Sequence, residues 1–411
     1  MSNVQSKKNI VVVGGGPAGV FAAMAAKHTA AAAHVVLLSD EACEPYEKPP
    51  LSKAVLTGKA LPEHAPIAGA KGTAAHGVVL QRTAAVIAID RAAGEVVTAA
   101  GPRYRYDALV LATGSLVREL PQLPLGGKRV HYLRTEADAR ALAAALRDCR
   151  RLLVVGGGLI GLEAAASAAE LGIDVTVLEV APRILARVCD EEAAAFIAAA
   201  HRRHGVDIRT GTAMARVEGG TDGISVTTAT GETLEADLVV VGTGVKPNDA
   251  LAAAAGLKTD DGIVVDALCR TSDPAIFAAG DAARFPGPHG AVRLENWRHA
   301  QDQGAVAGRN AAGGSDAYGA VPSFWSEQYD LYIQGVGWPP AQPATRVRRP
   351  LPGNGYLTFE VADGALAYAT GVNAQRDLAA TRRLIERRIA VDADALADPG
   401  RPLAALLKAT A

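Results

Sequence analysis

Three glycines near the start of the chain, Gly14, Gly16 and Gly19, have the spacing G-x-G-x-x-G, and the acidic residue Asp40 follows them. Glycine permits a tight turn at the first position, lets the backbone approach a pyrophosphate at the second, and lets a helix pack closely on a strand at the third. The helix that follows would offer free N–H groups and its positive dipole end to the phosphates. Asp40 can accept hydrogen bonds from a ribose hydroxyl. These residues therefore predict a dinucleotide site.

The same set of residue types occurs a second time in the middle of the chain. Gly156, Gly158 and Gly161 repeat the spacing in GGGLIG, and Glu179 ends the later segment DVTVLE. A single G-x-G-x-x-G would be weak evidence, but here each copy is followed by a helix-like run, a strand-like run and an acid. The sequence therefore predicts two dinucleotide sites.

The elements that must position these residues also repeat. The short apolar runs at 9–13 and 151–155 are typical of buried parallel strands, and each leads directly into its glycines. The later stretches at 107–114 (DALVLATG) and 237–244 (DLVVVGTG) match each other in pattern. We interpret this as two dinucleotide-binding units of similar plan, which would bring a hydride donor and a hydride acceptor face to face.

The bulk composition limits the function classes. The chain has 411 residues, of which 49% are apolar, and a formal net charge of −1. This charge argues against nucleic-acid binding and against binding to acidic surfaces. There is no apolar run long enough for a membrane helix and no signal-peptide pattern, so we expect a cytoplasmic protein without membrane attachment.

The four cysteines, Cys43, Cys149, Cys189 and Cys269, include no C-x-x-C or C-x4-C pair. This spacing removes a redox-active dithiol from the candidates, and we expect the last three to be reduced, mostly buried thiols. The sequence also lacks a cysteine cluster for an iron–sulfur centre, so we predict no metal site in this chain.

The segment at 271–281, TSDPAIFAAGD, completes a pattern with the two glycine groups. Together they resemble the FAD fingerprints of the two-dinucleotide flavoprotein reductases. The resemblance implies that FAD is bound by Gly14, Gly16, Pro17, Ala18, Gly19, Asp40, Lys48, Lys53, Val86, Ala112, Thr113, Gly114, Arg134, Gly280, Asp281, Glu295, Trp297 and Trp325. It implies that the nicotinamide nucleotide is bound by Gly156, Gly158, Leu159, Ile160, Gly161, Glu163, Glu179, Arg187 and Gly242.

Glu179 favours NADH as the nicotinamide nucleotide. A carboxylate at this position binds the two ribose hydroxyls but repels a 2′-phosphate, although Arg183 and Arg187 lie near enough in sequence to soften that repulsion.

For two of the predicted FAD-binding residues, Trp297 and Trp325, an alternative stays open. They could be ordinary core or interface aromatics instead of flavin contacts.

The stretch PYEKPPLSK at 45–53 narrows the family further. It resembles the P-Y-x-R-P-P-L-S-K signature of the ferredoxin reductases related to putidaredoxin reductase, which serve ring-hydroxylating dioxygenases and bacterial monooxygenase cytochromes. Lys48 replaces the usual arginine. We expect Ser52 to cap a following helix. The resemblance implies that Lys53 projects toward the flavin and pairs with Glu163, and that both have catalytic roles. On composition alone, Lys48 and Lys53 could be solvated loop charges.

The predicted fold is α/β, with two Rossmann-like domains and a small α+β domain at the C-terminus. We expect an FAD domain at 1–118 and 245–321, an NAD domain at 119–244 and a C-terminal reductase domain at 322–411.

The resemblance implies an NADH:ferredoxin reductase that transfers hydride from NADH to FAD and single electrons to a two-iron two-sulfur ferredoxin feeding an oxygenase. We expect a monomer or weak homodimer. An NADH oxidase or peroxidase and an apoptosis-inducing-factor-like interaction protein stay open as alternatives. The basic clusters at 201–204 and at Arg382, Arg383, Arg387 and Arg388 could dock an acidic ferredoxin, or they could be solvated helix faces.

Overall fold

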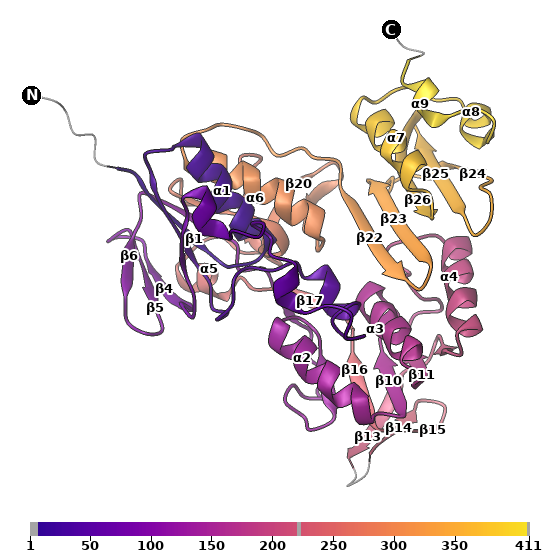
Figure 1. Cartoon of the computed structure of the whole chain (residues 1–411). Coiled ribbons are helices and arrows are strands. Elements are labelled where there is room, and N and C mark those ends of the chain that lie inside the picture. Colours follow the sequence, from indigo (N-terminus) through magenta and orange to yellow (C-terminus); the bar gives the residue numbers. More distant parts are fainter. Residues whose placement is uncertain (1–6, 220–222, 409–411) are drawn as a thin grey trace, which may run out of the picture. The chain divides into compact units, whose positions relative to one another are not determined.

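The computed structural model describes residues 7–219 and 223–408 (Figure 1). The chain folds into two compact units, each assembled from separate stretches. The first unit comprises Met1–Glu47, Pro62–Leu116 and Val245–Ala320, and the second comprises Lys48–Leu61, Val117–Gly244 and Val321–Ala411. The division into three domains stays a prediction.

A parallel five-stranded sheet forms the centre of the first unit. Its strands are β1 (Asn9–Val13), β2 (His34–Leu38), β3 (Val79–Gln81), β7 (Ala108–Leu111) and β19 (Ile276–Ala278), in the order β19-β7-β1-β2-β3. Every neighbouring pair is parallel. β1, β2, β7 and β19 are almost entirely buried, which is why their sequences are continuous apolar runs, whereas the edge strand β3 is partly exposed.

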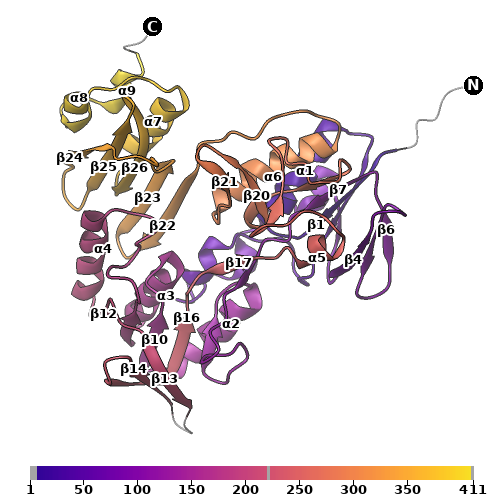
Figure 2. The same cartoon turned by 180° about the vertical axis from the view of Figure 1, so that it is seen from behind.

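Two helices, α1 (Pro17–Thr29) and α6 (Trp297–Ala311), lie side by side in the first unit (Figures 1 and 2). Gly304 and Gly308 of α6 face α1, and a Cβ on Gly308 would lie 2.0 Å from the carbonyl oxygen of Ala22. The close approach of the two helices therefore depends on these glycines. The unit also contains β4 (Val86–Asp90), β5 (Glu95–Thr98), β6 (Arg103–Arg105), β17 (Val245–Pro247), β18 (Ile263–Val264), β20 (Ala283–Gly287), β21 (Gly290–Val292) and α5 (Ala250–Ala254). The strand β8 (Ser115–Val117) begins in this unit, and its last residue belongs to the second unit.

The second unit contains a parallel sheet of the same plan. Its strands are β9 (Val130–Tyr132), β10 (Arg151–Val155), β11 (Asp174–Leu178), β12 (Asp207–Arg209) and β16 (Leu238–Val241), in the order β12-β11-β10-β16-β9. Each neighbouring pair is again parallel. The strand carrying the glycine turn lies at the centre of both sheets, which confirms the prediction of two Rossmann-like folds.

The other elements of this parallel-sheet region are helices and one small antiparallel sheet. A capping box formed by Thr135 and Asp138 begins the first helix, and the side chain of Asp190 caps another. The elements are α2 (Glu136–Ala145), α3 (Leu159–Glu170), α4 (Glu191–Arg203), β13 (Met214–Gly219), β14 (Ile224–Thr228) and β15 (Thr233–Ala236).

The C-terminal part of the second unit is an antiparallel sheet with helices gathered on one side (Figure 2). The strands are β22 (Ser323–Gln328), β23 (Leu331–Gly337), β24 (Thr345–Arg349), β25 (Tyr356–Ala362) and β26 (Ala365–Val372), and the helices are α7 (Gln375–Glu386), α8 (Ala393–Ala397) and α9 (Leu403–Leu406). Leu357 and Phe359 pack against Leu384 and Leu396 in the core between them. This confirms the predicted α+β region. Within residues 7–219 and 223–408, no helix is long and apolar enough to cross a membrane.

Candidate nucleotide-binding site

The first glycine turn joins β1 to α1 and leaves room only for glycine at two positions. Gly14 has a φ of +115°, and a Cβ there would lie 2.1 Å from the carbonyl oxygen of Ala112. A Cβ on Gly19 would lie 1.8 Å from the carbonyl oxygen of Gly14. These glycines therefore serve the packing of helix, turn and strand.

Gly16 has a different role in the same turn. A Cβ on Gly16 would meet no heavy atom of the described structure within 4 Å. Gly16 is also the N-cap of α1, and no side chain in the described part of the chain caps this helix; Pro17 and Ala18 form its first turn. Open space beside uncapped N–H groups fits the pyrophosphate of a dinucleotide.

Most of the other predicted FAD residues of the first unit lie at the carboxyl ends of its parallel strands. Asp40 follows β2, and Ala112, Thr113 and Gly114 follow β7. This is the edge at which open α/β sheets bind ligands.

Gly280 and Asp281 follow β19 at the same edge, and two residues that the sequence analysis missed hold them. The Ser115 hydroxyl donates to Asp281 Oδ2 at 2.8 Å, and the Gly280 N–H donates to Gln303 Oε1 at 2.8 Å. Gln303 is fully buried. A buried glutamine inside an amphipathic helix is a signal that could have identified it.

Val86, Glu295 and Trp297 lie on other elements of the first unit. Val86 begins β4, and Glu295 Oε1 pairs with Arg293 Nη1 at 2.8 Å. Trp297 begins α6, and its ring meets that of Phe21 edge to face with centroids 6.0 Å apart. Their contacts with FAD stay a prediction.

The second glycine turn joins β10 to α3 with the same geometry. Gly156 has a φ of +110°, and a Cβ there would lie 2.5 Å from the carbonyl oxygen of Gly242. A Cβ on Gly161 would lie 2.1 Å from the carbonyl oxygen of Gly156, whereas one on Gly158 would meet only Gly242 O at 4.0 Å. Leu159 and Ile160 begin α3 directly after this turn. The second turn therefore fits a pyrophosphate in the same way as the first.

Glu179 is held at the end of β11 by the backbone. Its Oε2 accepts a hydrogen bond from the Gly157 N–H at 2.7 Å, and its Oε1 accepts one from the Ala181 N–H at 2.8 Å. A carboxylate has further lone pairs on each oxygen, so Glu179 can still accept hydrogen bonds from ribose hydroxyls.

The two arginines near Glu179 differ in their surroundings. The Arg183 guanidinium donates to the carbonyl oxygens of Cys189 at 2.8 Å and Ala186 at 3.1 Å. A Cβ on Gly244 would lie 3.6 Å from Arg187 Nη2, which places Arg187 beside the loop after β16. Arg183 is therefore engaged by its own loop.

The two acidic residues do not occupy equivalent positions. β2 ends at Leu38 and β11 ends at Leu178, so Ser39 is the counterpart of Glu179. Asp40 comes one residue later and is exposed. The two units therefore share the G-x-G-x-x-G turn, but the acidic residue after the second strand is one position later in the first unit than in the second.

The residues from the signature PYEKPPLSK meet α3 within the second unit. Lys53 Nζ lies 3.1 Å from Glu163 Oε2, and the Ser52 hydroxyl donates to the same oxygen. The Ser167 hydroxyl donates to the Ser52 carbonyl at 2.8 Å. The structure thus brings Lys53 and Glu163 together as an ion pair.

The expectation that Ser52 caps a following helix was wrong. Ser52 is the last residue of the short 3₁₀ helix Pro49–Ser52, and the chain continues in turns. Its side chain is buried, and its hydroxyl donates to the Glu163 carboxylate. An N-cap hydroxyl accepts from the backbone N–H groups of the helix that follows it, and here turns follow Ser52 instead of a helix, so its hydroxyl serves as a donor to Glu163.

The remaining predicted FAD residues of this unit are Lys48, Arg134 and Trp325. Lys48 Nζ donates to the carbonyl oxygen of Arg134 at 3.3 Å, so these two are neighbours. Trp325 lies in β22 and is partly buried. Their approach to the flavin stays a prediction.

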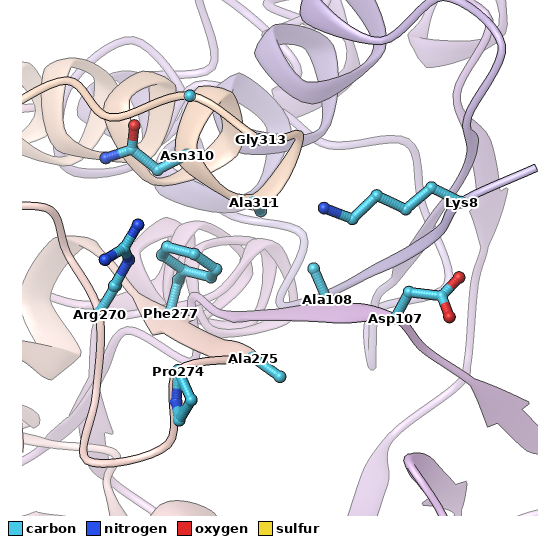
Figure 3. A pocket seen from close by; sticks show the side chains of 11 residues that line it. Lys8, Asp107, Ala108, Arg270, Pro274, Ala275, Phe277, Asn310, Ala311 and Gly313 are labelled. Carbon is cyan, nitrogen blue, oxygen red and sulfur yellow. The ribbon is translucent and has the colours of Figure 1, made fainter.

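A pocket of about 230 Å³ lies at the opposite edge of the first unit's sheet (Figure 3). Lys8, Asp107 and Ala275 line it, and they precede or begin the strands β1, β7 and β19. The glycine turn and Asp281 follow the other ends of these strands, so this pocket is separate from the dinucleotide site.

Three of the four cysteines are buried, as expected. Burial raises the pKa of the Cys149 thiol to about 11 and those of Cys189 and Cys269 to about 12. Cys43 is partly buried, and all four cysteines are free thiols.

Comparison with known proteins gives consistent matches over the whole chain. A family model described as pyridine nucleotide-disulphide oxidoreductase matches residues 8–304, and one described as reductase C-terminal matches residues 323–407. The chain is 40% identical over 394 residues to the anthranilate 1,2-dioxygenase system ferredoxin–NAD(+) reductase component of Burkholderia cepacia, covering 95% of this chain and 97% of that protein. It is 37% identical over 394 residues to rhodocoxin reductase of Rhodococcus erythropolis, covering 95% and 92%.

Among solved structures, the chain is similar to that of the covalent putidaredoxin reductase–putidaredoxin complex. The TM-score is 0.91 at 35% sequence identity, and the match covers 98% of each chain. The resemblance inferred from the sequence motifs is therefore confirmed.

Proposed function

The chain belongs to the pyridine nucleotide-disulphide oxidoreductase family, and from this premise we propose that it is an NADH-dependent ferredoxin reductase with FAD as its cofactor. The observation that carries the proposal is the doubled glycine turn. Gly16 and Gly158 each leave open space beside an uncapped helix N-terminus, at the centre of two parallel sheets of the same plan. Two such sites fit one dinucleotide that donates hydride and one that accepts it.

FAD, when bound, accepts a hydride from NADH and passes its electrons on singly. The residues of the chain bind and orient the two nucleotides. The turns at Gly14–Gly19 and Gly156–Gly161 provide backbone N–H groups for the pyrophosphates, and Asp40 and Glu179 provide acceptors for ribose hydroxyls. Lys53, paired with Glu163, supplies a fixed positive charge beside α3. No side-chain nucleophile is needed, since positioning and electrostatics suffice for hydride transfer.

NADH is favoured over NADPH by the loop that follows β11. Two backbone N–H groups fix the Glu179 carboxylate. Where that carboxylate binds the ribose hydroxyls of NADH, it would repel the 2′-phosphate of NADPH. Arg183 donates to carbonyl oxygens of its own loop, which leaves it poorly placed to offset the repulsion.

The electron acceptor that we propose is a two-iron two-sulfur ferredoxin feeding an oxygenase. Two relatives bear the names of reductases acting with a dioxygenase system ferredoxin and with rhodocoxin, and a similar structure is a complex with putidaredoxin. NADH supplies two electrons, and each ferredoxin takes one. Each NADH therefore reduces two ferredoxins and releases one proton.

The test compares two acceptors with the FAD-loaded protein. NADH-driven reduction of a two-iron two-sulfur ferredoxin is measured beside oxygen consumption without ferredoxin. We expect ferredoxin reduction to be much faster. Fast oxygen consumption with idle ferredoxin would instead identify an NADH oxidase. No reduction of the bound flavin by NADH would leave an interaction module as the better reading.

A further inference from the structure

Glu163 is a buried carboxylate surrounded by donors within the second unit. Its side chain is 4% exposed. Oε2 accepts from the Ser52 hydroxyl and from Lys53 Nζ, and Oε1 accepts from the Ser326 hydroxyl at 2.6 Å. Ser326 lies on β22, which packs against α3. Because a buried carboxylate is stable only when its oxygens are satisfied, Ser326 is needed on the side that Lys53 does not reach.

Ser326 is the first member of a longer side-chain hydrogen-bond network. Gln328 lies two residues further along β22, on the same face of the strand, and its Nε2 donates to Ser326 Oγ at 3.1 Å. His201 Nε2 lies 2.8 Å from Gln328 Oε1. Ser326, Gln328 and His201 are all buried. Since Gln328 Oε1 can only accept, His201 carries its proton on Nε2 and donates it.

Tyr329 is the last member of this hydrogen-bond network, at the end away from Glu163. With Nε2 protonated in a neutral imidazole, His201 Nδ1 accepts from the Tyr329 hydroxyl at 3.1 Å. Burial lowers the pKa of His201 to about 4, which keeps the ring neutral at ordinary pH. The Tyr329 ring also stacks on His204, with centroids 3.7 Å apart and planes 5° from parallel.

Backbone strain at Tyr329 indicates that its position matters. Its φ is +56°, in the left-handed region that non-glycine residues seldom adopt. Tyr329 lies in the turn between β22 and β23, where glycine would avoid this strain. The stacking on His204 and the bond to His201 hold the tyrosine there. Two members of the basic cluster at 201–204 therefore contact Tyr329: His201 is buried, whereas His204 is exposed and stacks on the tyrosine ring.

We propose that Ser326, Gln328, His201 and Tyr329 are positioning residues that fix the Glu163 carboxylate and, through it, the ammonium of Lys53. Each of the four side chains donates its hydrogen bond toward the Glu163 carboxylate. The hydrogen bonds of the network therefore polarise and strengthen one another. The proposal deepens the proposed function, because the Lys53–Glu163 pair is the part of the second unit expected to meet the flavin.

The first test measures how tightly Lys53 is held, without any turnover. Trace labelling of lysines with acetic anhydride, read by mass spectrometry, acetylates only the deprotonated amine and releases acetate. The extent of labelling therefore reports how readily each ammonium group leaves its partners and loses its proton to solvent. Lys53 is 18% exposed and should react slowly, while Lys59, 67% exposed and paired with Glu170 on the same helix, is an internal control. We expect Ser326→Ala to raise Lys53 labelling about fivefold, since the loss of one hydrogen bond is of that order, and to leave Lys59 unchanged.

Two further variants keep this test decisive. Gln328→Met removes the donor to Ser326 while keeping the volume, and we expect a smaller rise at Lys53. Thr381→Val is the matched control, because it removes a buried hydroxyl that donates within α7, to the Asp377 carbonyl oxygen. If Lys53 labelling stayed at the native level in both Ser326→Ala and Gln328→Met, with each variant shown to be folded, the proposal would be overturned.

The second test separates a positioning role from a merely structural one. In rapid mixing of FAD-loaded protein with NADH, Ser326→Ala should lower the limiting rate of flavin reduction about fivefold with little change in the apparent Kd for NADH. Ser326→Thr retains the hydroxyl and should restore most of the rate. Equal rates in native protein, Ser326→Ala and Ser326→Thr would contradict the proposal. A native protein that NADH does not reduce would overturn the proposed function instead, and the labelling result would still decide the positioning role.

Discussion

At the scale of single residues, the two kinds of glycine in the first turn make a separable prediction. Gly16→Ala should leave the stability of the flavin-free protein within about 0.5 kcal/mol of native, because its Cβ enters open space. It should nevertheless lower FAD affinity, because that space is where we expect the pyrophosphate. Flavin content after purification and urea unfolding of the flavin-free protein measure the two effects.

Gly19→Ala is the contrasting variant. Its Cβ would lie 1.8 Å from the carbonyl oxygen of Gly14, a backbone atom that cannot move without breaking the turn. We therefore expect a loss of stability of about 2 kcal/mol or more in the flavin-free protein. If Gly16→Ala and Gly19→Ala were equally destabilising, the distinction between a ligand glycine and a packing glycine would fail.

Glu179 carries a second prediction at this scale. Glu179→Ala should lower kcat/KM for NADH by about tenfold to a hundredfold, because two charged hydrogen bonds to the ribose are lost. It should leave kcat/KM for NADPH unchanged or raised, because the repulsion of the 2′-phosphate is also lost. The preference is measured as the ratio of the two kcat/KM values. Glu235→Ala, on the exposed hairpin of β14 and β15, is the control. If Glu179→Ala had the same ratio of kcat/KM for NADH to kcat/KM for NADPH as the native protein, Glu179 would not determine the nucleotide preference.

At the scale of elements, the sequence predicted those features whose cause is local. Apolar runs before glycines predicted β1 and β10, and the residue spacing predicted the turns and the helices behind them. The role of Ser52 could not be predicted, because its acceptor on Glu163 is 111 residues away. The same holds for Ser326, whose bond to Glu163 spans 163 residues. Local sequence shows which side chains can donate, and only the packing of elements shows where the acceptors lie.

The packing of α6 on α1 gives a prediction of its own. Gly308→Ala should lower the free energy of unfolding by about 2 kcal/mol or more, because its Cβ would lie 2.0 Å from the carbonyl oxygen of Ala22. Gly319→Ala is the matched control, since a Cβ there meets no described atom within 4 Å. Both are measured by urea unfolding. Equal midpoints for the two variants would show that the helices can separate freely.

At the scale of the whole molecule, the chain builds the same sheet twice from different stretches. The outer strand beside β7 is β19, which comes late in the sequence, whereas its counterpart beside β16 is β9, which comes early. The motif repeat predicted the duplication, and the segment at 271–281 indicated a late strand in the FAD domain. Neither predicted the order of the strands, because that order depends on contacts between segments far apart in the sequence. The net charge of −1 likewise describes the whole chain and contains no information about where charged groups pair.

Two buried histidines, one in each unit, should make the molecule unstable in acid. Burial lowers the pKa of both His201 and His299 from 6.5 to about 4. Between these values the unfolded chain binds protons that the folded chain does not, so the free energy of unfolding falls as pH decreases from about 6.5 to about 4. Each histidine should contribute about 1.4 kcal/mol per pH unit, or about 3 kcal/mol over the whole window, and the contribution is fully present above pH 6.5.

The groups around each ring determine how this is tested. His201 faces Gln328 and Tyr329, and the charge of His204 adds to the effect of burial on the pKa of His201. His299 Nδ1 lies 2.7 Å from the Tyr318 hydroxyl, and the charge of Asp281 partly opposes the effect of burial on the pKa of His299. Urea unfolding of His201→Gln at pH values from about 7.5 to 4.5 should show a slope smaller by about 1.4 kcal/mol per pH unit than in the native protein. His289→Gln changes an exposed histidine between β20 and β21 and should keep the native slope. If the free energy of unfolding of His201→Gln depended on pH as steeply as that of the native protein, the buried His201 imidazole would not cause the instability in acid. If the slope were smaller by the expected amount, His299 would account for a further part of the pH dependence.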